Sequence, residues 1–130
     1  MGDIHPPTDL VHEVGSIIVQ DEQIGAHPWQ AVSMVVVLDG APSISGYVYD
    51  AAGKATPELP DNNGIFDACR RLRDAMQRDN PTKKAWRAAL FQIRRPEMKA
   101  TFQFEYDDAH RWDVTPGNFS TKPEELRPKD

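Results

Sequence analysis

Residues 86–107 read WRAALFQIRRPEMKATFQFEYD, and this stretch decides the fold class of the chain. Its second half alternates apolar and polar side chains, as a strand does when one of its faces is buried. Its first half, Trp86 to Arg94, predicts another strand, and Arg95-Pro96-Glu97-Met98 is the tight connection between the two. The stretch therefore predicts an antiparallel strand pair. The alternating apolar residues are Ala100, Phe102, Phe104 and Tyr106.

A second strand pair is predicted upstream. Trp29 to Leu38 is rich in β-branched residues and almost continuously apolar, which indicates a central strand covered on both faces. Asp39-Gly40-Ala41-Pro42 has the composition of a turn, and Ser43 to Asp50 follows it as the next strand. Residues 51–54 are another turn, compatible with a short extended segment after it.

Two helices are predicted, one before each strand pair. In the first, apolar residues from Leu10 to Ile24 recur at helical spacing, and Thr8 is the expected N-cap. The second begins after possible N-caps at residues 61–63 and ends before Asn80-Pro81. Its apolar face consists of Ile65, Cys69, Leu72 and Met76.

These elements predict an α+β fold, in the order helix, two strands, helix, two strands. We expect an antiparallel sheet of about four strands with helices packed on it. Residues 1–114 should form a single domain, and residues 115–130 a flexible polar tail, because Pro, Gly and charged residues dominate it. Deleting residues 122–130 should then leave folding nearly unchanged. Phe102→Ala should cost roughly 3–5 kcal/mol, because Phe102 is expected in the core. Its expected neighbours there are Cys69, Leu72, Met76, Phe91 and Phe104.

Length and composition exclude several classes of protein. The chain has 130 residues, enough for one hydrophobic core. The sequence pI of about 5.3 argues against a dedicated nucleic-acid-binding protein. No apolar run is long enough to span a membrane, and Met1 to Pro7 lacks the features of a signal peptide. The single cysteine fits a reducing compartment but does not require one, and the sequence predicts no direct nucleic-acid or membrane partner. The oligomeric state stays open.

No motif for catalysis, a cofactor or a metal site emerges. Cys69 lies on an apolar helix face, which favours a buried, inert thiol over a nucleophile. Asp107, Asp108 and His110 could in principle bind a divalent metal, but a strand-ending turn is naturally rich in aspartate. The three tryptophans, which flank predicted strands, are interpreted as packing residues. From the residues alone an enzyme stays possible, although nothing in them supports one, and no cofactor or metal is expected.

Charge is distributed unevenly along the chain. Residues 1–61 contain nine acidic residues and one basic residue, Lys54, whereas residues 62–130 contain 14 basic and 11 acidic residues. Residues 70–99 alone carry a net charge of +7. Either the two halves pack together and neutralise each other, or an acidic face remains on the surface. An acidic face would steer basic partners toward the protein.

Several residues resemble the YezG-like immunity proteins, which are antitoxins of bacterial polymorphic and contact-dependent growth inhibition toxins. The resemblance spans about Leu10 to Trp112 and consists of hydrophobic patterning with a few aromatic residues. The matching positions are Trp29 before Val32 to Leu38, Gly46-Tyr47-Val48-Tyr49, Leu72-Arg73, Trp86 with Leu90, Phe91 and Ile93, Phe102 to Asp107, and Arg111-Trp112.

The resemblance implies a cytoplasmic protein, not an enzyme, that binds and neutralises a cognate toxin domain, with a nuclease as the expected class. A nuclease has a basic surface, so its inhibitor should present carboxylates. From the residues, the candidate toxin-binding positions are Glu13, Asp21, Asp39, Asp50, Glu105, Asp107 and Asp108. The alternatives are a small ligand-binding or enzymatic domain with a pocket between sheet and helices, and a secretion adaptor or chaperone.

Overall fold

The computed structural model describes residues 8–61, 64–95, 97–113, 115–118 and 120–128. Four helices and five strands are assigned within these ranges. In chain order they are α1 (Thr8–Gln20), α2 (Glu22–Gly25), β1 (Trp29–Val37), β2 (Ser43–Asp50), β3 (Ala55–Pro57), α3 (Gly64–Asp79), β4 (Ala88–Arg94), β5 (Lys99–Glu105) and α4 (Lys122–Glu125).

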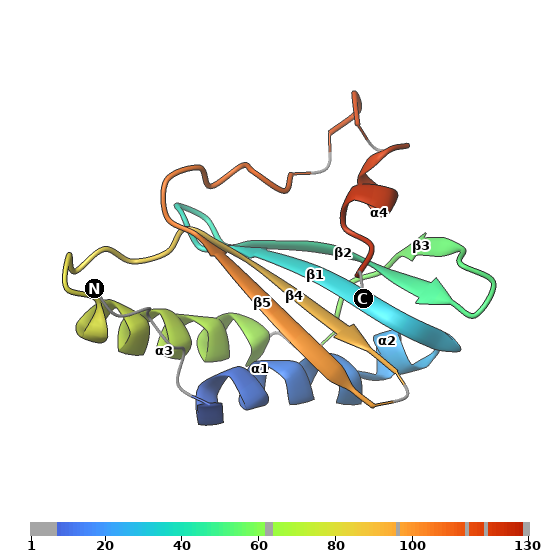
Figure 1. Ribbon diagram of the computed structural model, residues 1–130, viewed down its shortest axis with the longest axis horizontal. Helices are drawn as coiled ribbons and strands as arrows, with labels where there is room; N and C mark the ends of the chain where they lie inside the picture. Colours follow the sequence, from blue (N-terminus) through green and yellow to red (C-terminus); the bar gives the residue numbers. More distant parts are fainter. Residues whose placement is uncertain (1–7, 62–63, 96, 114, 119, 129–130) are drawn as a thin grey trace.

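All five strands belong to one antiparallel sheet with the order β3-β2-β1-β4-β5 (Figure 1). The predicted α+β class and both strand pairs are confirmed, but the sheet has five strands instead of about four. The additional strand is β3, a segment of three residues that pairs with the end of β2. The sequence had allowed a short extended segment at this place, but three residues carry too little alternation to be counted as a strand of the sheet.

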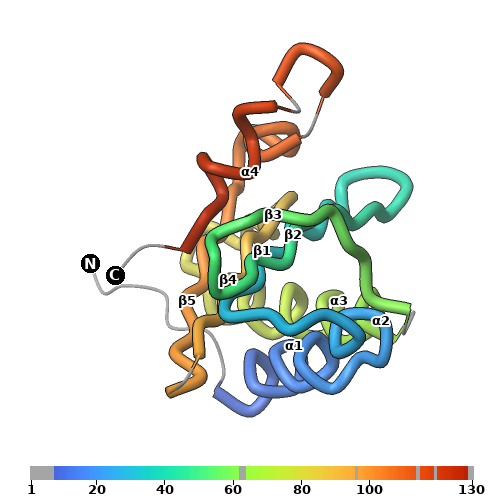
Figure 2. The backbone as a smooth tube through the Cα atoms, turned by 90° about the vertical axis from the view of Figure 1, so that its right-hand side faces the viewer, coloured from blue at the N-terminus to red at the C-terminus, as the bar shows by residue number. Residues whose placement is uncertain are grey.

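Helices α1, α2 and α3 cover one face of the sheet (Figures 1 and 2). Their buried side chains meet the alternate residues of the strands in one hydrophobic core, in which Cys69, Leu72, Met76 and Phe91 are fully buried. Phe102 and Phe104 pack against this core but are only partly buried, because β5 is an edge strand. The three tryptophans are all buried, as the packing interpretation predicted.

The first predicted helix is divided in two at Asp21. This residue has an extended backbone, with φ −67° and ψ 133°, and its carboxylate accepts hydrogen bonds from the backbone N–H groups of Gln23 and Ile24. A carboxylate that satisfies these N–H groups favours a new helix start over a continuous helix. Asp21 is therefore the N-cap of α2, and the apolar stripe continues across the break to the buried Ile24.

The C-terminal segment packs on the opposite face of the sheet (Figure 2), which differs from the expected loose tail. Leu126 is buried in a second hydrophobic cluster with Trp112, Val35 and Leu90. This cluster explains why β1 is apolar on both faces, as its sequence predicted.

Hydrogen bonds from the sheet hold the backbone of this segment in place. The hydroxyl of Ser33, which is fully buried, donates to the carbonyl oxygen of Leu126, and Gln92 Nε2 donates to the same oxygen at 2.9 Å. The Tyr49 hydroxyl donates to the carbonyl oxygen of Pro123 at 2.7 Å. The acceptors in these hydrogen bonds are main-chain carbonyl oxygens, which every residue has. The polar side chains of the segment therefore did not predict that it packs on the sheet.

We therefore predict that deleting residues 122–130 destabilises the protein. Burying one leucine side chain contributes about 1.5–3 kcal/mol, and the deletion also leaves the buried Ser33 hydroxyl without its acceptor. Thermal unfolding followed by circular dichroism should show a lower melting temperature for the deletion and for Leu126→Ala. Ser120→Ala, at an exposed position just before α4, is the control and should change little. An unchanged melting temperature of the deletion variant would contradict the docking.

Candidate functional site

The seven carboxylates predicted to bind a partner do not form one surface. The N–H group of Leu38 donates a hydrogen bond to the carbonyl oxygen of Arg87 at 2.9 Å, and the N–H group of Arg87 donates one to the carbonyl oxygen of Glu105 at 2.7 Å. These ends of β1, β4 and β5 therefore lie side by side at one end of the sheet. Asp39, Asp107 and Asp108 follow these strands and lie at that end with Glu105. Asp50 pairs with Trp29 at the opposite end. Glu13 and Asp21 belong to the helical layer.

At the end of the sheet that holds Glu105, basic side chains accompany the acidic ones. Lys84 Nζ lies 2.9 Å from Asp107 Oδ1, and Arg111 Nη1 lies 3.2 Å from Glu105 Oε1. Glu105 also accepts the backbone N–H groups of Asp107 and Asp108, and these hydrogen bonds, with that of Arg111, hold the pKa of its carboxyl below the usual range. This end is a mixed-charge surface in which Glu105 organises the turn after β5.

Other predicted positions also have structural partners. Glu13 Oε1 lies 2.8 Å from Arg71 Nη1 of α3, so this pair joins the acidic and basic parts of the chain. Asp50 accepts the N–H groups of Ala52 and Lys54 in the turn after β2. Asp21 was predicted to bind a partner, but it is buried and acts as the N-cap of α2. The ion pair of Glu13 with Arg71 therefore neutralises charge between the acidic first half of the chain and its basic second half.

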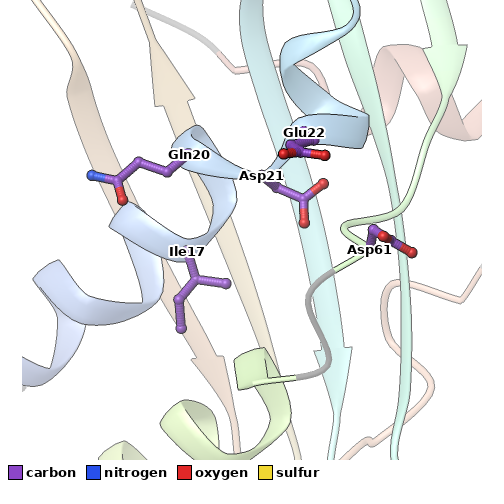
Figure 3. A pocket seen from close by; sticks show the side chains of 5 residues that line it. All are labelled: Ile17, Gln20, Asp21, Glu22 and Asp61. Carbon is purple, nitrogen blue, oxygen red and sulfur yellow. The ribbon is translucent and has the colours of Figure 1, made fainter.

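A recess where α1 meets α2 gathers three carboxylates into one place, Asp21 and two that were not among the seven. It has a volume of about 240 Å³ and is lined by Ile17, Gln20, Asp21, Glu22 and Asp61. Figure 3 shows the carboxyl groups of Asp21 and Glu22 on the side of the recess nearer to Asp61, with Gln20 extending away. None of these described lining residues is basic. The charged side chains among these lining residues are therefore all negative.

Hydrogen bonds between α2 and the segment after β3 support the shape of the recess. His27 Nε2 and Glu58 Oε2 are 2.6 Å apart, and Gln23 Nε2 donates to the same oxygen at 3.3 Å. The hydrogen bond with His27 lowers the pKa of the Glu58 carboxyl. These contacts hold residue 58 against α2 and thereby place Asp61, three residues further along, opposite Glu22.

Sequence analysis did not single out Glu22 and Asp61. Both side chains are exposed. The only feature of the sequence that could have indicated them is that they belong to the acidic first half of the chain. Thirty-nine positions separate them, so the pairing of an α2 residue with the loop before α3 depends on the tertiary fold.

Other kinds of site find little support among the described residues. No three His, Cys, Asp or Glu side chains within the described ranges lie close enough together to hold a metal ion. Cys69 is fully buried, and burial raises the pKa of its thiol to about 12, so it is not a thiolate at neutral pH. No helix in this part of the chain has the length and apolar character needed to cross a membrane.

Two further recesses flank the C-terminal segment on the second face of the sheet. The one beside β3 has a volume of about 690 Å³, and its lining is mainly apolar, including Ile44, Tyr47, Pro57 and Pro123. The one beside β5 has a volume of about 410 Å³, and its lining includes Gln103, Arg111 and Glu125. Both are open to solvent and lie between the sheet and the C-terminal segment that contains α4, on the face opposite α1 and α3.

Comparison of the chain with protein-family models and with curated proteins found no match in either case.

Proposed function

We propose that this chain is an immunity protein that binds a cognate bacterial toxin domain in the cytoplasm and blocks its activity. The observation that carries the proposal is the recess in which Asp21, Glu22 and Asp61 meet without a basic lining residue among those described. Glu22 and Asp61 present the exposed carboxylates, whereas Asp21 also caps α2. A negative concavity of this kind complements a protruding basic group on a partner.

A nuclease toxin is the partner that fits this charge. Its active-site surface must attract phosphate and is therefore basic, and steered association helps an inhibitor to reach it before it cuts. The recess, which keeps Asp21 from the seven predicted carboxylates, replaces their scattered set as the centre of the proposed interface, because Asp107 and Glu105 already face Lys84 and Arg111.

The ligand-binding alternative has less support. It requires a pocket between the sheet and the helices, but buried side chains such as Leu72, Met76 and Phe91 fill the centre of that space. The recess at its edge, between α1 and β5, is open and mainly apolar. Binding by the surface, as in an immunity protein or a secretion adaptor, agrees better with this packing. These two functions differ in whether binding inhibits the partner.

The test is to measure binding and inhibition of the toxin domain encoded beside this gene. Glu22→Lys/Asp61→Lys should lower the association rate, and the loss should shrink as salt is added because screening acts over about 8 Å at physiological ionic strength. Asp39→Lys/Asp108→Lys adds the same charge at the other end of the sheet and is the matched control.

Several results would count against the proposal. Equal losses in the two double variants would show that only net charge matters, which removes the recess from the interface. Binding without inhibition would favour the adaptor function, and a toxin that does not bind would overturn the immunity function. Melting temperatures of both variants separate loss of binding from loss of folding.

A further inference from the structure

The two edges of the sheet differ in how well they are protected against pairing with another strand. β3 forms one edge with only three residues, the last of which is Pro57. β5 forms the other edge with seven residues, pairs with β4 in a continuous register, and contains neither proline nor a bulge. Shortness and proline are common means of blocking an edge, so β5 is the edge left open to association.

The side chains of β5 are also unusually accessible for a strand next to the core. Ala100 is exposed, and Phe102 and Phe104 are only half-buried. An apolar recess of about 330 Å³ lies beside them, between α1 and the edge of the sheet. Its lining includes Val11, Val19 and Phe102, together with Met98, a large apolar residue that is exposed.

We propose that β5 is a self-association surface on which a second copy of this chain pairs its own β5 in antiparallel orientation, with Phe102 opposite Phe102. In this register Lys99 lies opposite Glu105 of the second copy, because each is three residues from Phe102. Thr101 lies opposite Gln103, and Ala100 opposite Phe104. Charged, polar and apolar residues therefore each meet a compatible side chain.

The faces of the sheet agree with this register. Residues directly opposite in an antiparallel pair share a face, so the apolar row would lie on the helix side, beside the recess, and the polar row on the side of the C-terminal segment. A shift by one residue would place Thr101 opposite Phe102 and reverse the faces. Glu105 already accepts three N–H groups, but a carboxylate has about four acceptor positions, so the ammonium group of Lys99 can still be received.

A twofold pairing of this kind closes after two chains, which commits the proposal to a dimer with one continuous sheet. It does not depend on the proposed immunity function, and its test uses the chain alone.

Analytical ultracentrifugation of the full chain over a wide range of concentrations should show a dimer. Thr101→Glu/Gln103→Glu places like charges opposite each other and should raise the dimer dissociation constant about tenfold or more. Thr101→Lys/Gln103→Lys should do the same, and mixing the acidic with the basic variant should restore a dimer. Ser43→Glu/Ser45→Glu adds the same charge at the same spacing on β2, an interior strand, and should stay dimeric.

A cross-linking experiment tests the register itself. Chains carrying Thr101→Cys, mixed with chains carrying Gln103→Cys, should form a disulfide-linked pair, and Cys69 is too buried to interfere. A wild-type chain that is monomeric at every concentration would overturn the proposal. So would an acidic variant that dimerises as well as the wild type, or an acidic–basic mixture that stays monomeric.

Discussion

Phe91→Ala is expected to lower the free energy of unfolding by about 3–5 kcal/mol, the usual range for a fully buried phenylalanine. Phe91 lies in the middle of β4 with 1% of its surface exposed. Its ring meets Phe102 and Phe104 at centroid distances of 5.8 and 6.4 Å, in edge-to-face geometry. Truncation therefore removes aromatic contacts on two sides and leaves a cavity between the sheet and the helices.

The matched variant is Phe102→Ala, measured by urea denaturation under the same conditions. From the sequence pattern, we predicted that Phe102→Ala lowers the free energy of unfolding by roughly 3–5 kcal/mol. Because Phe102 lies on an edge strand and is half-buried, we now expect a clearly smaller loss there. Equal losses in the monomeric protein would mean that the β5 side chains are more deeply buried than the structure shows.

Gly46→Ala is the second substitution with a large expected effect. A Cβ atom at position 46 would overlap the backbone carbonyl oxygen of Ser33 and lie 2.5 Å from Met34 Sδ. Met34 can change rotamer, but the carbonyl belongs to β1 at the centre of the sheet and cannot move without disturbing the strand pairing. Overpacking typically costs about 1–3 kcal/mol, and a backbone overlap should give a value at the upper end or above it.

Gly25→Ala provides the control for Gly46→Ala in the same chemical denaturation experiment. A Cβ atom at position 25 would meet no atom within 4 Å, so only the backbone preference changes. Alanine in place of a helical glycine is neutral or stabilising by up to about 1 kcal/mol. If both variants had the same stability, β1 and β2 could not approach each other as closely as the structure indicates.

Local sequence patterns were sufficient to predict those helices and strands that bury one of their faces in the core. The spacing of Ile65, Cys69, Leu72 and Met76 predicted α3, and all four are buried in it. The alternation of Ala100, Phe102 and Phe104 predicted β5 and its core-facing side. These patterns arise because a helix and a strand repeat with periods that are fixed by the backbone. The α+β class follows from them.

Local patterns failed where a residue's partner is distant in the chain. Nothing near Leu126 shows that Ser33 and Gln92 bind its carbonyl oxygen, because both lie on other strands. The break at Asp21 was missed for a related reason, since the apolar stripe continues through it and only the cap geometry ends α1.

The amino-acid sequence by itself determined the class of the fold, the two strand pairs, the main helix and the imbalance of charge between the two halves. Tertiary structure alone decided which charges meet. It brought Glu13 to Arg71 and Asp107 to Lys84, and it left Glu22 and Asp61 together in a recess. The physical reason is that backbone periodicity is local, whereas the energy of a charge depends on its neighbours in space, which only the packed chain defines.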